Sequence, residues 1–315
     1  MANRLILVVP CYNEELVLPE TVQNLTTLLE QMIQQGLVSS SSRILFVNDG
    51  SQDRTWELIC SYHESNSYVC GVNLAGNVGH QNALMAGMET AKELGDIIVS
   101  IDADLQDDIS VIPEMVRKYQ EGTDIVYGVR RERKTDTWFK RTSAQRFYKV
   151  LSGLGVKTVY NHADFRLMSR RAVEQLCRYR ERNLFLRGIV PQLGYQTDCV
   201  YYDREARKAG ESKYPLKKQL ALAWDGISSF SVKPLRIVSI CGVLSLLVAL
   251  GILVYVLCSL FSGSAVSRWA SLMLSIWFIG GCLLLGLGII GEYIGKIYLE
   301  VKDRPRFNIE KTLLK

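Results

Sequence analysis

The chain has 315 residues, 48% of them hydrophobic and 22% charged, which excludes an intrinsically disordered protein and allows more than one domain. Its formal net charge of +5 is small for this length, which argues against a nucleic acid as partner. The mean hydropathy is positive, at +0.07, and the hydrophobic residues are concentrated near the C-terminus.

The N-terminal part of the chain predicts an alternation of short apolar strands and helices. Strands are expected at residues 4–9, 44–47, 70–74, 96–101 and 124–129, and helices at 15–32, 55–62 and 83–94. Buried apolar strands separated by helices are typical of a parallel sheet that is covered on both faces. Such sheets bind ligands in the crevice at the carboxyl ends of their strands, so the residues after each strand are the candidates for function.

Acidic residues follow three of the expected strands, in the segments 10–15, 49–51 and 102–104. The ends of neighbouring parallel strands meet at one edge of a sheet, so these side chains should converge on one rim. No GxGxxG sequence follows the first strand, and no P-loop sequence (GxxxxGK followed by Ser or Thr) occurs in the chain. The phosphates of a bound nucleotide must therefore be neutralised in another way.

Asp102 and Asp104 are two residues apart, so in extended backbone their carboxylates point to the same side. Two close carboxylates repel each other unless a cation lies between them, and oxygen ligands suit Mg²⁺ or Mn²⁺. The pair therefore predicts a metal–diphosphate site. The alternative is a solvated pair of loop residues or a helix cap.

Basic residues cluster at two places in the second half of the chain. Arg130, Arg131, Arg133 and Lys134 follow the last expected strand, and residues 204–236 contain eight basic and three acidic side chains. Arginine forks such as Arg130 suit phosphate oxygens, and a basic segment of this kind attracts an anionic bilayer surface.

Two long uncharged runs near the C-terminus predict a hairpin of two transmembrane helices. Residues 237–261 and 269–291 are runs of 25 and 23 residues, and about 20 apolar residues cross a bilayer. The seven residues of the connection, 262–268, are too few for a domain, so both flanks must lie on one side. Basic residues on these flanks place that side in the cytoplasm. We expect a multi-pass protein of the cell membrane with its N-terminal domain and both termini in the cytoplasm.

Five segments resemble a known family in order along the chain: 9–15 (VPCYNEE), 47–53 (VNDGSQD), 77–83 (NVGHQNA), 102–108 (DADLQDD) and 163–167 (ADFRL). They are similar to family 2 glycosyltransferases of GT-A fold, and within them to the polyprenyl-phosphate glycosyltransferases such as dolichol-phosphate mannose synthase. The C-terminal spans, which end in 291–296 (GEYIGK), look like those of the bactoprenol glucosyltransferases. The resemblance implies an α/β fold with a GT-A (Rossmann-like), mostly parallel sheet, helices on both faces, and a C-terminal two-helix transmembrane hairpin.

Six parts of the chain follow from this resemblance and the hydropathy together. They are a cytoplasmic GT-A domain (1–214), a juxtamembrane amphipathic segment (215–234), two transmembrane helices (235–261 and 269–291), a short extracytoplasmic loop (262–268) and a cytoplasmic tail (292–315).

The resemblance also implies roles for individual residues. The nucleotide sugar would be bound by Pro10, Tyr12, Glu14, Asp49, Asp102 and Arg130; Mg²⁺ or Mn²⁺ by Asp102, Asp104 and Gln106; and the diphosphate or lipid phosphate by Arg207, Ser212 and Lys213. Asp104 and Asp164 would be the catalytic residues. Two roles remain open for Asp164, a general base near the acceptor or simply an ion-pair partner of Arg166. A phosphate acceptor with a second pKa of about 6 is largely ionised at neutral pH and needs little help from a base.

The expected reaction is inverting transfer of a hexose from a UDP-sugar to a polyprenyl phosphate, giving a lipid-linked sugar for cell-envelope glycosylation. Glucose and undecaprenyl phosphate are the first choice by resemblance, and N-acetylglucosamine, galactose or a modified arabinose are the alternatives. A processive synthase is disfavoured because the second half lacks a QxxRW motif. The other class is an inactive, membrane-tethered protein that binds nucleotide sugars. The resemblance also implies a homo-oligomer, a tetramer, and no nucleic-acid partner.

Overall fold

The structure, a computed structural model, describes residues 2–131, 162–181, 184–203 and 268–315, together with single positions between 238 and 254. Of these, the residues up to 203 and those from 304 to 315 form one compact unit, and those from 238 to 303 belong to a second unit. Each unit is considered by itself.

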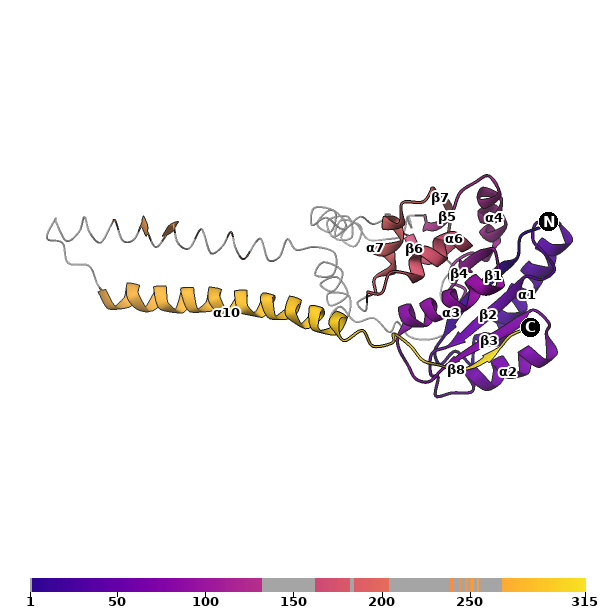
Figure 1. The fold of residues 1–315 in the computed structure, drawn as a ribbon, viewed down its shortest axis with the longest axis horizontal. Helices are drawn as coiled ribbons and strands as arrows, with labels where there is room; N and C mark the ends of the chain where they lie inside the picture. The colour runs from indigo at the N-terminus through magenta and orange to yellow at the C-terminus, as the bar shows by residue number, and fades with distance from the viewer. Residues whose placement is uncertain are drawn as a thin grey trace. The chain divides into compact units, whose positions relative to one another are not determined.

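The first unit is built on one sheet with the strand order β7-β5-β6-β4-β1-β2-β3-β8 (Figure 1). Its strands are β1 (Leu5–Cys11), β2 (Arg43–Asn48), β3 (Val69–Leu74), β4 (Ile97–Ser100), β5 (Ile125–Arg130), β6 (His162–Ser169), β7 (Thr197–Tyr202) and β8 (Ile309–Leu313). The helices of this unit are α1 (Leu18–Gln34), α2 (Thr55–Ser65), α3 (His80–Leu94), α4 (Ile112–Gln120), α6 (Arg170–Cys177) and α7 (Leu186–Ile189), with 3-10 turns at Ile109–Val111 and Val190–Leu193. The expected strands and helices up to residue 130 are all present, with ends shifted by a few residues.

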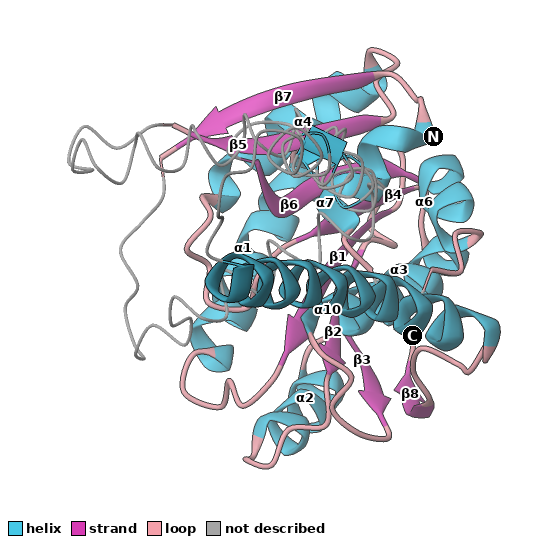
Figure 2. Cartoon of the chain, turned by 90° about the vertical axis from the view of Figure 1, so that its left-hand side faces the viewer, coloured by secondary structure: helices cyan, strands magenta, loops and turns pink. Residues whose placement is uncertain are grey.

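Helices cover both faces of the sheet, as the alternation of elements predicts (Figure 2). Leu5, Leu7 and Val9 of β1 share a core with α1, α2 and α4. Val8, which lies between Leu7 and Val9, faces α3 on the other side of the sheet. A Cβ atom at Gly87 would lie 2.4 Å from a methyl group of Val8, so a residue without a side chain lets α3 pack closely on the sheet. This contact packs α3 against β1.

The sheet is mixed because β6 and β8 run against their neighbours. Strands β1, β2, β3 and β4 are parallel, but β6 is antiparallel to both β4 and β5. Neither β6 nor β7 is among the strands that the sequence predicts. In β6 the apolar pattern is interrupted by Asp164 and Arg166, which are buried through ion pairing rather than by hydrophobicity.

β8 closes the other edge of the sheet, where it pairs antiparallel with β3. The amide of Ala75 donates to the carbonyl of Asn308 at 2.9 Å, and the side chain of Asn73 donates to Glu310 at 2.7 Å. The segment expected as a cytoplasmic tail therefore contains a strand that is part of the N-terminal domain.

In the second unit, α10 (Arg268–Val301) contains a stretch, Phe278–Val301, that is long and apolar enough to cross a membrane. Large apolar side chains such as Leu283 and Leu284 are 63% and 72% exposed, unlike those of a soluble core helix. The second expected span, 269–291, lies within α10. Most of the first, 235–261, falls outside the described residues, so the two-helix hairpin remains a prediction.

Candidate functional site

The candidate site lies at the carboxyl ends of β1, β2 and β4, and β6 reaches it from the opposite direction. Because β6 is antiparallel to β4, the pairing of Ser100 with Arg166 brings the first residues of β6 to the last residues of β4. The hydroxyl of Ser100 donates to the carbonyl of Asp164 at 2.5 Å. This register sets Asp164 beside the segment 102–108.

The loops after β1 and β2 are fastened together by backbone-to-side-chain hydrogen bonds. Asn13 has a left-handed backbone (φ 54°), which asparagine tolerates, and its amide donates to the hydroxyl of Ser51 at 3.0 Å. In return the amide of Gln52 donates to Oδ1 of Asn13 at 2.8 Å, and the amide of Glu14 donates to Thr55 at 2.9 Å. These hydrogen bonds join the loop after β1 to the loop after β2.

Four of the six residues expected to bind the nucleotide sugar, those on the loops after β1 and β2, differ in their surroundings. Pro10 is buried within β1, Tyr12 is 38% exposed on the rim, and Glu14 is half-buried between them and α1. Asp49 is only 3% exposed, and its two carboxylate oxygens accept from the amides of Val78 and Gly79 at 2.7 and 3.0 Å. Asp49 thus anchors the turn that begins α3, a contact that the sequence does not predict. Burial raises its pKa, and those amide hydrogen bonds oppose the rise.

Asp102 and Asp104 stand directly after β4. The side chain of Asp102 is 40% exposed, and Oδ1 lies 3.6 Å from Nε2 of His80, the first residue of α3. Asp104 accepts hydrogen bonds from the backbone amide of Gln106 at 3.3 Å and from its side-chain Nε2 at 2.8 Å. Leu105 between them has a positive φ of 44°, so the chain turns sharply around the acidic pair.

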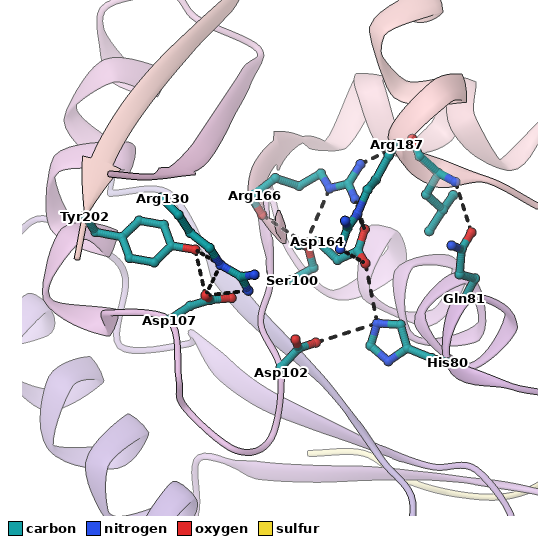
Figure 3. Close-up of polar contacts among 11 residues, drawn as sticks. His80, Gln81, Ser100, Asp102, Asp107, Arg130, Asp164, Arg166, Arg187 and Tyr202 are labelled. Atoms are coloured by element: carbon teal, nitrogen blue, oxygen red, sulfur yellow. Dashed lines mark hydrogen bonds and ion pairs between the residues drawn. The ribbon is translucent and has the colours of Figure 1, made fainter. Parts of the chain in front are cut away.

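Asp164 is held by two arginines (Figure 3). Arg166, which is fully buried, lies 2.6 Å from Oδ1, and Arg187 reaches Oδ2 at 3.1 Å through Nη2 and Oδ1 at 3.3 Å through Nε. Nε2 of His80 lies 3.9 Å from Oδ2. Burial alone would raise the pKa of Asp164, but the Arg187 and Arg166 guanidiniums, with His80, hold that pKa well below its usual range. The expected pairing with Arg166 is present, and an aspartate this acidic is a weak base.

Arg130, expected at the nucleotide sugar, contacts the segment after the acidic pair (Figure 3). Its Nη2 lies 2.8 Å from Oδ1 of Asp107, and the hydroxyl of Tyr202 donates to the same oxygen at 2.7 Å. Asp107 is 2% exposed, and its Oδ2 is buried with no hydrogen-bond partner among the described residues. Arg130 and Tyr202 therefore tie the acidic segment to the ends of β5 and β7.

The donor set at Asp102 and Asp104 fits a divalent cation. Partial burial raises the pKa of Asp102, and the nearby carboxylates of Asp164, Asp107 and Asp104 raise it further. His80 lowers this pKa. A cation would relieve this crowding of negative charge. No group of three or more His, Cys, Asp or Glu side chains able to hold a metal occurs in the part of the chain that the structure describes. Water and phosphate oxygens would complete the coordination, as is usual for Mg²⁺.

Two of the residues found here, Asp107 and Arg187, have no role in the sequence prediction. Asp107 was visible in the DADLQDD segment, but no sequence signal marks Arg187. The expected phosphate-side residues Arg207, Ser212 and Lys213 lie outside the described residues.

Comparison with known proteins identifies relatives along the whole chain. Glycosyl transferase family 2 matches residues 6–177. An uncharacterized glycosyltransferase of Bacillus subtilis (strain 168) is 54% identical over 313 residues, covering 98% of this chain and 92% of the relative. The SfII prophage-derived bactoprenol glucosyl transferase of Shigella flexneri is 41% identical over 311 residues, covering 97% of each chain. Among solved structures, the mannosyltransferase PcManGT of Pyrobaculum calidifontis, in complex with GDP-Man and Mn²⁺, gives a TM-score of 0.43 at 16% identity, covering 95% of this chain and 85% of that one.

Proposed function

This chain belongs to glycosyl transferase family 2, and on that basis we propose that it is a membrane enzyme that transfers a hexose from a UDP-sugar to a polyprenyl phosphate. The bactoprenol glucosyl transferase of Shigella flexneri supports this acceptor, and it supports glucose as the sugar, because the two chains match over 97% of their lengths. N-acetylglucosamine, galactose and a modified arabinose are alternatives within the same reaction.

The proposal rests on the acidic edge of the sheet, where Asp102 and Asp104 lie near Asp164. The fastened loops that carry Tyr12, Glu14 and Asp49 would bind the nucleoside. Asp102, Asp104 and Gln106 would hold Mg²⁺ or Mn²⁺. The metal would offset the negative charge of the departing UDP. Arg130 would hold this acidic segment in place through Asp107.

The acceptor supplies its own nucleophile. A phosphate monoester with a second pKa of about 6 is largely ionised at neutral pH, so its oxygen can attack C1 of the sugar without losing a proton to the enzyme. Attack from the face opposite UDP gives inversion in a single displacement. Arg207, Ser212 and Lys213 are proposed to bind phosphate, as the resemblance implies.

The pairing of β8 with β3 supports a hairpin in the membrane. The end of α10 and the N-terminal domain must lie on the same side, because β8 follows α10 directly and is a strand of that domain. If α10 crosses the bilayer, a second crossing must occur between residues 203 and 268, where the span 235–261 is expected. Both termini then lie on one side, which the basic residues flanking the spans predict to be the cytoplasm. We also retain the homo-oligomer, a tetramer, as a prediction.

The reaction is tested with purified protein, undecaprenyl phosphate, Mg²⁺ and a panel of radiolabelled UDP-sugars. We expect the label of UDP-glucose to enter the organic phase. No lipid-soluble label from any donor would refute the proposal and favour an inactive nucleotide-sugar-binding protein.

The metal site is tested in the same assay with Asp104→Asn. This variant should lose at least about 100-fold in kcat, since it removes a charge that the diphosphate site requires. Asp108→Asn is the matched control, because Asp108 caps the following turn through Ser110 and asparagine caps equally well. Equal activity of the two variants would remove Asp104 from the metal site.

A further inference from the structure

Arg187 grips both oxygens of a carboxylate at the candidate site. It belongs to the short helix α7, and its Nη2 and Nε lie 3.1 and 3.3 Å from Oδ2 and Oδ1 of Asp164. A bidentate contact of this kind fixes the orientation of a carboxylate and favours its ionised form. The Arg187 side chain is 36% exposed, so it stands on the open side of Asp164, whereas Arg166 lies behind it with no exposure.

Two other elements hold α7 where Arg187 can make this contact. The amide of Leu186 donates to Oε1 of Gln81 in the first turn of α3 at 3.0 Å (Figure 3). The carbonyl of Leu186 accepts from Nη1 of Arg166 at 3.4 Å. Arg187 is therefore built into a network that joins α3, β6 and α7.

Within the described residues, charged groups face Asp164 from four elements. His80 faces it from α3, Arg166 from its own strand, Arg187 from α7, and Asp102 from the end of β4. The two arginines exceed the single charge of Asp164 by one, and Asp102 and Asp104 lie nearby. A carboxylate that is 8% exposed would otherwise favour its neutral form.

We propose that Arg187 is a positioning residue for the transfer reaction: it keeps Asp164 ionised and in one orientation, so that Asp164 accepts a hydrogen bond from a hydroxyl group of the bound sugar and takes no proton. A carboxylate has about four acceptor positions, and the guanidinium N–H groups of Arg166 and Arg187 occupy three of them. The inference rests on the proposed function, because it names the part of the donor that Asp164 contacts.

The test compares Arg187→Gln, Arg187→Lys and Asp164→Asn with the wild-type protein. Arg187→Gln should lower kcat by about 10- to 100-fold, since the sugar is no longer held in one orientation. Binding of UDP alone, which lacks the sugar, should not change. The acidic limb of the kcat/KM profile should not move, because the acceptor phosphate sets it. Loss of a neighbouring cation raises the pKa of Asp164, so its carboxyl group should titrate at higher pH than in the wild type.

Arg187→Lys retains the charge but not the bidentate contact, so it should restore the titration of Asp164 and recover kcat only in part. The double variant with Asp164→Asn and Arg187→Gln should be no slower than Asp164→Asn alone, because Arg187 acts through Asp164. Arg170→Gln is the matched control. Arg170 is 40% exposed and paired with Glu174 at 3.0 Å, but it begins α6 at the opposite end of β4. It should behave as wild type.

A readout without substrate separates this inference from the proposed function. The carboxyl group of Asp164, followed by ¹³C NMR, should remain ionised to lower pH in the wild type than in Arg187→Gln. Identical titrations in the two proteins would overturn the positioning role, even if the melting temperature of Arg187→Gln fell. Absence of transfer by the wild type would instead count against the proposed function and leave the titration to decide the role of Arg187.

Discussion

Arg130 and Arg131 are adjacent at the end of β5, yet their ion pairs lie in different surroundings. Arg130 lies 2.8 Å from Asp107, whose side chain is 1% exposed. Arg131 lies 3.8 Å from Asp203, and these side chains are 62% and 81% exposed. Water screens an exposed pair, which contributes about 0–1 kcal/mol, whereas removing one member of a buried pair costs about 3–5 kcal/mol. The ion pair of Arg130 is therefore expected to contribute more to stability than the ion pair of Arg131.

We predict that Arg130→Gln lowers the free energy of unfolding by about 3 kcal/mol, at the lower end for a buried pair because Arg130 is itself 22% exposed. Arg131→Gln should lower it by less than about 1 kcal/mol. Urea denaturation of the detergent-solubilised protein measures both. Similar losses in the two variants would mean that the Asp107 contact contributes little to stability.

At the scale of elements, β8 protects an edge of the sheet that would otherwise be open. An unpaired edge strand offers its amides and carbonyls to other chains, and β3 is such a strand without β8. The pairing extends from Leu74 opposite Ile309 to Gly71 opposite Leu313. Lys315 adds side-chain contacts to the carbonyls of His63 and Asn66 at the end of α2.

Removal of residues 308–315 should therefore expose β3. Hydrogen exchange of Ala75 and of the β3 amides should quicken, because Ala75 loses its acceptor on Asn308. Leu314→Ala is the control, since this side chain is 43% exposed and lies beyond the paired residues. Unchanged exchange in the truncated protein would mean that β8 does not protect the edge in solution.

For the whole molecule, the strand pairing of residues 309–313 constrains the path of the chain through a membrane. A reporter that is active only outside the cytoplasm, such as alkaline phosphatase, should be active when fused after residue 265. Green fluorescent protein fused after Lys315 should fluoresce, because that end is expected in the cytoplasm. An inactive phosphatase fusion would place the 262–268 connection in the cytoplasm and contradict the hairpin.

Local patterns in the sequence were sufficient for the first five strands and for α1, α2 and α3, because apolar periodicity and turn residues report on near neighbours, but they were not sufficient for α4. They were also sufficient to identify the acidic pair Asp102 and Asp104, since both residues follow a buried strand directly. Family membership follows from the same segments, and the comparisons confirm it.

Only the tertiary structure decided which charges that are distant in the sequence meet. Asp107 and Arg130 are 23 residues apart, as are Asp164 and Arg187, and Asn73 is 237 residues from Glu310. β6 enters the sheet between β4 and β5 against the direction of both, which no local periodicity encodes. The physical reason is that an ion pair or a strand pairing forms between groups that the fold brings close in space. The separation of two residues along the sequence does not determine their distance in the folded chain.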